Sequence, residues 1–340
     1  MKRSLALLLG VIVLLAGCGG SSKKSSSGTT SKNGSNVKIG LVTDVGGLND
    51  RGFNHLSYAG LLRAQKDFGV QQRVYQANST QQYVPNLSTF ARQGYKLTIG
   101  VGFTEAEAID TAAHNFPSSK FAIVDVDQTT EPHKPPNLLG LLFKEQETGY
   151  LVGYLAGLEA KRLPGPDVIG SVGGQKQPPV DRFIAGYQAG AKAADPGIKT
   201  LNGYSQDFSD QAKCKQVALN QIEQGAVVIF QVAGGCGLGA LDAAKEKHVW
   251  GIGVDADQSF LGPHILTSAV KRVDTAVFDA IKLAVDGRFK GGNLVFGLKD
   301  NGVGVGKISP KVPKSEVAQV NKIRAEIISG KISNIPTTVP

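Results

Sequence analysis

Short apolar runs alternate regularly with amphipathic segments of helical period along most of this 340-residue chain. Strands alternating with helices of 10 to 17 residues indicate βαβ units and a mainly parallel sheet. The first set of elements therefore predicts one α/β lobe. Its members are strand 37–43, helix 53–68, strand 72–76, helix 80–93, strand 97–101, helix 105–115, strand 120–125 and strand 138–142.

The alternation begins again near residue 146 and predicts a second lobe. A local echo supports the repeat, because FAIVDVDQ, from Phe121, and WGIGVDADQ, from Trp250, both end a buried strand with Asp-x-Asp-Gln. The echo places Asp125 and Asp255 at corresponding strand ends. The predicted elements are helix 146–161, strand 167–172, helix 180–193, strand 199–203, helix 209–224, strand 226–231, helix 238–246 and strand 249–254.

The last elements of the chain are too few for a third domain. They are strand 265–270, helix 271–287, strand 294–298 and helix 313–329. We expect them to complete both lobes, with the chain crossing near residues 143–146, 264–270 and 299–305. The predicted N-terminal lobe is 37–143 plus 270–299, and the predicted C-terminal lobe is 144–264 plus 305–340.

The first 18 residues have the pattern of a bacterial lipoprotein signal. Lys2 and Arg3 precede the apolar run 5–15, and small residues lead to Cys18. A retained transmembrane helix needs about 20 apolar residues, more than this run supplies. We therefore expect a lipidated Cys18 that anchors the protein to the extracytoplasmic face of the cell membrane, with the polar segment 19–36 as a flexible tether.

The net charge and its distribution along the sequence limit the classes of partner that the protein can bind. The formal net charge of +9 becomes +7 when Lys2 and Arg3 are removed, because 35 basic residues then face 28 acidic ones. After the tether, basic and acidic residues are interspersed, and no basic stripe is interleaved with aromatic residues. This pattern argues against nucleic acid as a partner. We expect a monomer whose membrane contact is the lipid anchor.

The segment Thr43–Asn54, TDVGGLNDRGFN, is the first candidate for binding chemistry. It follows the first apolar strand, has the adjacent glycines Gly46 and Gly47 after its carboxylate, and runs into a helix. Open α/β sheets place ligands at such corners, outside the carboxyl ends of their strands. Here Asp44 can accept two hydrogen bonds and Phe53 offers a ring face.

Aromatic residues occur near several strand ends: Phe53, Phe103, Phe183 and Phe208. Large apolar side chains are usually core residues. Phe53 and Phe208 are the exceptions we favour, because each lies beside polar loop residues. Two facing rings clamp a flat heterocycle, and stacking tolerates different bases.

Other motifs are weaker. Gly235–Ala240, GCGLGA, matches the dinucleotide fingerprint, so a secreted NAD-dependent oxidoreductase is an alternative, although an extracytoplasmic protein has no supply of NAD. The segment Gly302–Lys307 fails the P-loop pattern and is predicted to be a hinge or turn. The Asp-x-Asp pairs lack the ligand-rich loop of a calcium site, and no hydrolase or metalloprotease motif is present. We expect no enzyme activity, cofactor or metal.

The sequence contains two cysteines in addition to Cys18. Cys214 lies in the first turns of one predicted helix, and Cys236 lies in the loop after the next strand. Outside the cytoplasm such a pair forms a disulfide if the βα units bring it together. Two separate buried thiols are the alternative, because the Cα separation is not set by the sequence pattern.

Several motifs in order resemble the basic membrane protein family, the PnrA-like substrate-binding lipoproteins of ABC transporters. The resemblance covers nearly all of the mature chain and implies a type I periplasmic-binding-protein fold: two Rossmann-like lobes, a three-crossing hinge and a ligand between the lobes. It also implies a nucleoside ligand, with a purine favoured, and a permease as partner. The motifs are TDVGGLNDRGFN, FKEQETGYLVGYLAG, GGQKQPPVDRFIAGYQAG, FQVAGGCGLG, IGVDADQ and TSAVKRVD.

The resemblance also assigns roles to residues. It implies that Asp44 hydrogen-bonds the base, with Asn54 as a further base contact, while Phe53 and Phe208 stack on the base. It assigns the ribose hydroxyls to a second group: Asp125, Gly234, Asp255 and Lys271.

This chain departs from the family pattern at three positions. The family often has threonine at position 236 and no cysteine at 214, so the paired change favours a disulfide. Gly52 stands where the family commonly has serine. A sensor of the same fold that binds a sugar or signalling ligand and docks to a receptor is a further alternative.

Overall fold

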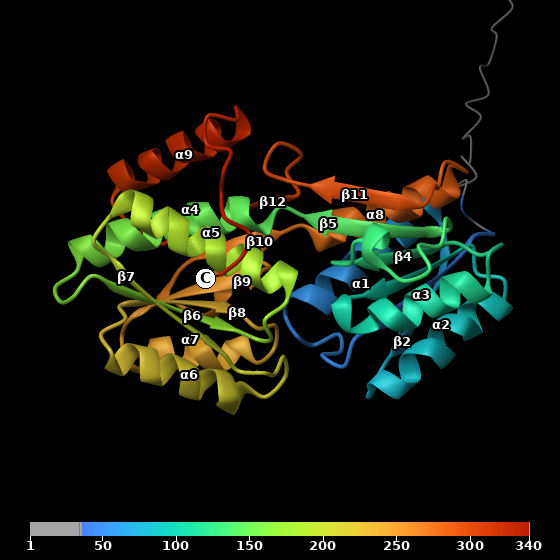
Figure 1. The fold of residues 1–340 in the computed structure, drawn as a ribbon, viewed down its shortest axis with the longest axis horizontal. Helices are drawn as coiled ribbons and strands as arrows, with labels where there is room; N and C mark the ends of the chain where they lie inside the picture. The colour runs from blue at the N-terminus through green and yellow to red at the C-terminus, as the bar shows by residue number, and fades with distance from the viewer. Residues whose placement is uncertain (1–33, 35, 340) are drawn as a thin grey trace, which may run out of the picture. The chain divides into compact units, whose positions relative to one another are not determined.

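The computed structural model describes residue 34 and residues 36–339, in which two six-stranded sheets each form the centre of a lobe (Figure 1). The first sheet has the order β11-β5-β4-β3-β1-β2, with β1 Lys38–Thr43, β2 Gln71–Gln76, β3 Leu97–Val101, β4 Phe121–Val124, β5 Leu138–Phe143 and β11 Gly292–Phe296. The second has the order β12-β10-β9-β8-β6-β7, with β6 Val168–Gly173, β7 Lys199–Tyr204, β8 Val228–Val232, β9 Trp250–Asp255, β10 Ile265–Lys271 and β12 Val303–Val305.

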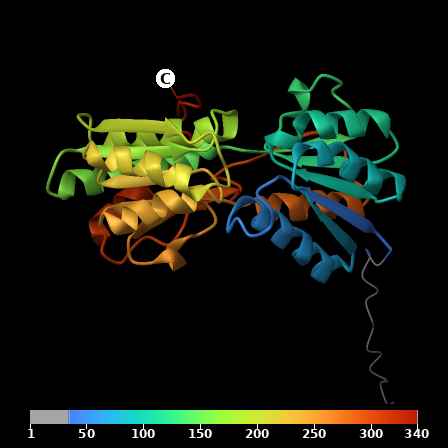
Figure 2. The same ribbon diagram turned by 90° about the horizontal axis from the view of Figure 1, so that it is seen from below.

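Helices cover both faces of each sheet (Figures 1 and 2). In the first lobe α1 pairs with α8 and α2 with α3; in the second, α4 pairs with α5 and with α9, and α6 pairs with α7. The helices are α1 Phe53–Phe68, α2 Tyr83–Arg92, α3 Ala106–Asn115, α4 Glu145–Arg162, α5 Pro178–Ala194, α6 Gln211–Glu223, α7 Gly237–Glu246, α8 Val273–Val285 and α9 Lys314–Ile328. Short 3₁₀ helices are η1 Thr80–Gln82, η2 Phe103–Glu105, η3 Gln128–Thr130 and η4 Ser259–Leu261.

Burial explains the strand patterns. Every residue of β3 (LTIGV) and β8 (VIFQV) is buried and most are apolar, because helices cover both faces of a parallel sheet. The edge strand β2 (QQRVYQ) keeps polar residues and has only exposed or half-buried positions. The core therefore lies along the central strands of each sheet.

The two sheets repeat one topology. Strand β1 lies between β2 and β3, and β6 lies between β7 and β8, all in parallel register. In each sheet the strand order reverses at that point, which is where open α/β sheets bind ligands. Each sheet thus contributes half of one candidate site. The strand ends concerned are those of β1, β3 and β4 in the first sheet and of β6, β8 and β9 in the second.

The predicted middle crossing was placed too early. Strand β10 pairs with β9 and therefore belongs to the second lobe, and the chain crosses only after Lys271. The predicted turn at Gly302–Lys307 is also corrected, because β12 within it pairs with β10 in antiparallel register. Apolar patterning marks a strand but does not say which sheet it joins.

The lipoprotein signal, Cys18 and the tether apart from Gly34 and Asn36 lie outside the described residues. Gly34 is buried, and its N–H donates to the carbonyl of Phe68 at 3.0 Å, so packing against the first lobe begins inside the predicted tether. No helix within the described residues has the length and apolar character needed to cross a membrane.

Candidate functional site

A cavity that is partly open to solvent lies between the carboxyl ends of the two sheets. Both lobes line it. All eight residues proposed from the sequence as ligand contacts are among its lining: Asp44, Phe53, Asn54, Asp125, Phe208, Gly234, Asp255 and Lys271.

Asp44 follows β1 and is held by its own loop. Its Oδ1 accepts from the N–H of Gly46 at 2.8 Å and from Nδ2 of Asn54 at 2.7 Å. The second N–H of the Asn54 amide donates to Oδ2 of Asp50 at 3.1 Å. Because Oδ1 of Asp44 already has two donors, Oδ2 is the oxygen left for a ligand.

Asp50 was not selected from the sequence, although it lines the cavity and supports Asn54. Its carboxylate accepts from the backbone N–H groups of Gly52, Asn54 and His55 at 3.1, 2.7 and 3.1 Å. These are donors at the start of α1, where a carboxylate is favoured by unpaired N–H groups and the helix dipole. An acidic residue just before a predicted helix was the available signal.

Asp125 and Asp255, the two echoed carboxylates, share an unusual backbone conformation. Their φ angles are 68° and 61°, in the left-handed region that residues other than glycine seldom adopt. Such strain concentrates at functional sites. Here it turns two side chains from corresponding strand ends, one in each lobe, into one cavity.

Lys271 ends β10 and joins the lobes electrostatically. Its ammonium contacts Oδ2 of Asp125 at 2.6 Å and Oε1 of Glu145 at 3.0 Å, and the three side chains are at most 5% exposed. Oδ1 of Asp125 is buried and has no hydrogen-bond partner among the described residues. That orphan acceptor is available to a ligand donor.

The charges are crowded enough to shift pKa values. Burial raises the pKa of Asp255 to about 7, against the attraction of Lys271, and the charge on Asp125 adds to the increase. Burial likewise raises the pKa of Asp44 to about 6, against the hydrogen bonds from Asn54 and Gly46. Burial lowers the pKa of Lys271, but Asp125, Glu145 and Asp255 outweigh it and raise that pKa above its usual value.

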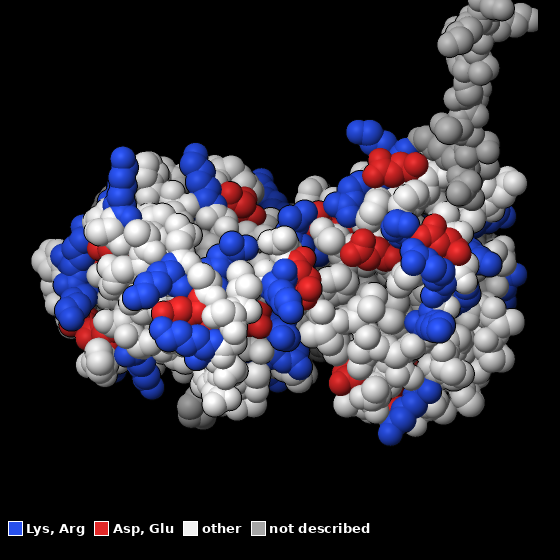
Figure 3. All heavy atoms as spheres, turned by 90° about the horizontal axis from the view of Figure 1, so that it is seen from above, with Lys and Arg blue, Asp and Glu red and all other residues white. Residues whose placement is uncertain are grey.

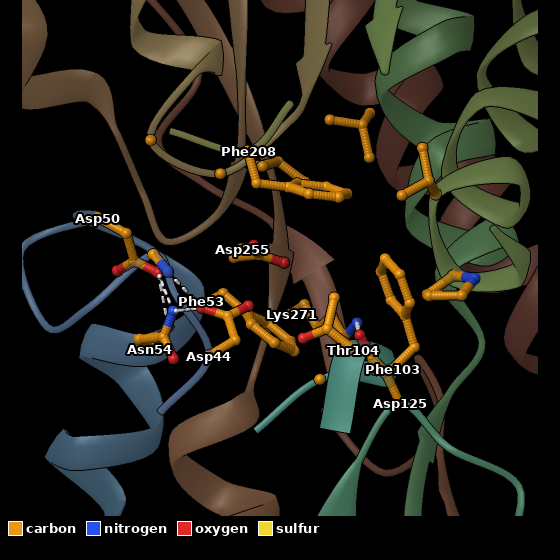
Figure 4. A pocket seen from close by; sticks show the side chains of 18 of the residues that line it. Asp44, Asp50, Phe53, Asn54, Phe103, Thr104, Asp125, Phe208, Asp255 and Lys271 are labelled. Carbon is orange, nitrogen blue, oxygen red and sulfur yellow. Dashed lines mark hydrogen bonds and ion pairs between the residues drawn. The ribbon is translucent and has the colours of Figure 1, made fainter. Parts of the chain in front are cut away.

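The four aromatic residues noted in the sequence all line the cavity: Phe53, Phe103, Phe183 and Phe208. Phe208 and Phe53 lie on opposite sides of it in Figure 4. The edge of Phe103 meets Phe208, with centroids 5.7 Å apart, and the Lys271 ammonium lies 5.3 Å from the Phe53 centroid. Phe103 therefore extends the aromatic wall beyond the two rings favoured from the sequence.

Two buried glutamates near the cavity were not identified from the sequence. Glu145, at the start of α4, is fully buried against Lys271, and burial raises its pKa. Glu105 is fully buried below Asp44, where its Oε1 accepts from Val101 N–H at 3.1 Å, and burial raises its pKa well above the usual range. Each follows a predicted strand within four residues, but only the fold shows that it is enclosed.

Cys214 and Cys236 are joined by a disulfide, with Cα atoms 5.5 Å apart. Neighbouring βα units thus bring the two cysteines together, and the disulfide, not the pair of separate thiols, is present. Gly234 and Gly235, in the same loop as Cys236, line the cavity.

Stability of the empty protein should fall as the pH rises, in part through Asp255. Because its folded-state pKa of about 7 exceeds the ordinary 3.8, the folded protein retains a proton that the unfolded chain releases. This contribution is present below about pH 4 and is lost as the pH passes through 7. The Asp255→Asn variant stays neutral, so denaturant titrations should show it gaining stability relative to wild type between about pH 4.5 and 8. A relative loss for the variant at pH 8 would contradict the raised pKa.

Two α/β lobes that contribute carboxylates, a buried lysine and aromatic rings to a shared cavity define a protein that encloses a small polar solute. Comparison with known proteins gives the family. A model described as ABC transporter substrate-binding protein PnrA-like matches residues 37–338.

Relatives extend over most of the chain. The ABC transporter nucleoside-binding protein BmpA of Lactococcus lactis subsp. cremoris is 35% identical over 352 residues, with 96% of each chain covered. An uncharacterised lipoprotein of Pyrococcus horikoshii is 37% identical over 319 residues, covering 89% of this chain and 77% of the relative. The crystal structure of an ABC transporter solute-binding protein from Aeropyrum pernix K1 superposes with a TM-score of 0.80 at 28% identity, covering 88% of this chain and 94% of that one.

The chain belongs to the PnrA-like (Bmp) family of ABC transporter substrate-binding proteins. The resemblance inferred from the motifs is confirmed, as is the two-lobed α/β fold of solute-binding proteins. Membership assigns the chain a solute-binding role.

Proposed function

We propose that this protein binds a nucleoside, with a purine favoured, between its lobes and delivers it to an ABC permease. In this proposal a lipid on Cys18 holds it at the extracytoplasmic face of the cell membrane. The observation that carries the proposal is the cavity itself, which offers aromatic rings and buried acceptors to the same ligand. The name of the Lactococcus lactis relative, a nucleoside-binding protein, supports the choice of ligand.

The proposed base site lies between Phe53 and Phe208. Stacking on an aromatic ring contributes about 1–3 kcal/mol per base and depends little on base identity. Oδ2 of Asp44 is positioned to accept from a ring or exocyclic N–H, because Oδ1 is occupied by Gly46 and Asn54. Selectivity among bases would therefore come from this polar edge.

The proposed ribose site is formed by Asp125, Asp255, Lys271 and the Gly234 loop. Figure 4 shows Asp125 and Lys271 on the opposite side of the cavity from Asp44 and Asn54, with Asp255 between them. Ribose hydroxyls both donate and accept, so two carboxylates and an ammonium suit vicinal hydroxyls. A ligand without them would leave Oδ1 of Asp125 unpaired.

Residues from both lobes make these proposed contacts, which gives the ligand a reason to close the protein. A ligand shifts a conformational equilibrium only by its difference in affinity for the two states. Asp44, Phe53 and Asp125 belong to one lobe, and Phe208, Asp255 and Lys271 to the other, so only a closed form presents all of them. The closed form is the species that a permease would recognise.

Isothermal titration calorimetry of the mature domain, refolded to remove any carried-over ligand, tests the proposal. Adenosine, guanosine, inosine, cytidine, uridine, ribose and free adenine are the ligands. We expect tight binding of nucleosides and much weaker binding of ribose and adenine alone, because each part uses only half of the contacts. Binding of a sugar with no response to any nucleoside would overturn the nucleoside assignment.

A further inference from the structure

The ring of Phe208 stands on the loop 205–210, which joins β7 to α6 and is called here the Phe208 loop. The carbonyl of Phe208 accepts from the N–H of Cys236 at 2.9 Å. On its inner side a Cβ at Gly174 would overlap the ring, so the ring lies directly against the backbone after β6. The loop is thus pressed between two glycine segments of the same lobe.

The disulfide joins the helix that follows this loop to the segment that packs against it. Cys214 is in the first turn of α6, six residues after Phe208, and Cys236 immediately precedes α7. Both side chains are fully buried. The Cys236 sulfur also lies 3.4 Å from Oγ of Ser205, at the other end of the loop. The bridge therefore links Cys236, whose N–H holds the Phe208 carbonyl, to α6, the helix that follows the Phe208 loop.

We propose that the Cys214–Cys236 disulfide is a positioning element of the binding site, which holds the Phe208 ring at the stacking distance set for a flat base. The inference rests on the proposed function, because it takes Phe208 as one face of the base site. Without the bridge, the start of α6 and the Gly234–Cys236 loop are held together only by hydrogen bonds and packing. The ring then samples positions that do not stack, and affinity falls.

A bridge that only stabilised the fold would predict something different. It would lower the melting temperature, but affinity measured well below that temperature would be unchanged. A thermodynamic cycle separates the two roles, because mutations that act through one group are non-additive. If the bridge acts through the Phe208 ring, removing the bridge costs no affinity once the ring is gone.

The experiment uses calorimetry with the nucleoside that binds wild type most tightly. The proteins are wild type, Cys214→Ala/Cys236→Ala, Phe208→Ala and the triple variant. We expect the cysteine pair to weaken binding by about three- to tenfold, within the range of a partial loss of stacking. We expect the triple variant to match Phe208→Ala within about twofold.

Folding of the variants is checked by thermal unfolding, and a second pair keeps the test decisive. Cys214→Ala/Cys236→Thr retains a hydroxyl that can reach Ser205 and serves if the alanine pair does not fold. The exposed Asp67→Ala on α1 is the matched control and should leave affinity unchanged.

The outcomes are distinct. Unchanged nucleoside affinity in both folded cysteine pairs overturns the positioning role while leaving the proposed function intact. An equal loss in the wild-type and Phe208→Ala backgrounds also overturns it, because the bridge would then act elsewhere. No nucleoside binding by wild type overturns the proposed function, and the inference with it.

Discussion

At pH 8, where Asp255 is mostly ionised, replacing it with alanine should weaken nucleoside binding by about 100-fold or more, because hydrogen bonds to a charged acceptor contribute about 1.5–3 kcal/mol each. Asp255 is the carboxylate at the end of β9, and it is 7% exposed in a cavity shared with Asp125 and Lys271. Ribose hydroxyls that lose this acceptor find no water to replace it once the lobes close. The loss should therefore fall on the ribose-dependent part of the affinity.

The measurement is calorimetry of Asp255→Ala against the preferred nucleoside and its 2′,3′-dideoxy analogue. The variant should discriminate between the two ligands much less than wild type, because one of the ribose acceptors is gone. The melting temperature should not fall, because the removed carboxylate lies among other carboxylates and its pKa is raised by burial. Asp67→Ala again provides the control. Undiminished nucleoside binding by Asp255→Ala would remove Asp255 from the site.

Replacing Lys271 with methionine should lower the free energy of unfolding by about 3–5 kcal/mol at pH 8, because it leaves buried Asp125 without its cation and Glu145 with only the pair to Arg182 at 3.6 Å. The ammonium contacts Asp125 and Glu145, and the lysine side chain is only 2% exposed. Methionine has similar length and keeps most of the apolar contact with the surrounding rings, so the loss reports charge rather than volume. Ligand binding should disappear together with the ribose contact.

Denaturant titrations of Lys271→Met at several pH values measure this effect. Burial already raises the pKa of Glu145, and the variant removes the Lys271 charge that lowers it, so the folded-state pKa of Glu145 lies further above its unfolded value. Stability is therefore lost as the pH rises and recovered as it falls. The deficit should therefore shrink between about pH 8 and pH 5. Lys282→Met is the matched control, since Lys282 is 45% exposed and pairs with Asp286 one helical turn away. A deficit independent of pH, or equal in both variants, would argue against the buried cluster.

Basic and acidic residues are interspersed on the surface, as the sequence indicated. Figure 3 shows Lys and Arg spread over this face of both lobes, with Asp and Glu among them. Exposed pairs such as Lys215 with Asp242 and Glu246 are screened by water and contribute little. We expect the charges with the largest effect on binding to be the few enclosed in the cavity.

The elements were predictable because their signals are local. Helix α1 occupies 53–68 as predicted, and its end at Gly69 follows from a left-handed residue with φ of 77° that glycine adopts without strain. Strand β3 occupies 97–101, also as predicted, because a short apolar run is buried on both faces. The position of β10 was not predictable from such signals, since its pairing with β9 is a tertiary contact.

The site was predictable only in part. Asp44, Asp125 and Asp255 stand at strand ends, which the topology of parallel sheets brings to one edge. The partnership of Lys271 with Asp125 spans 146 positions, and that of Lys271 with Glu145 joins the end of β10 to the start of α4. No periodicity reports such a pair. Burial of Glu105 and Glu145 is likewise a property of the packed protein.

The amino-acid sequence was sufficient to indicate the repeat of two parallel α/β lobes, the family and the strand ends that carry carboxylates and aromatic residues. These follow from periodicity and short motifs, which are written in neighbouring residues. Four features depend on the packed protein: the lobe that receives β10, the disulfide between Cys214 and Cys236, the buried charge cluster around Lys271 and the raised pKa of Asp255. Each depends on distances and on exclusion of water, and both exist only after distant segments have packed together.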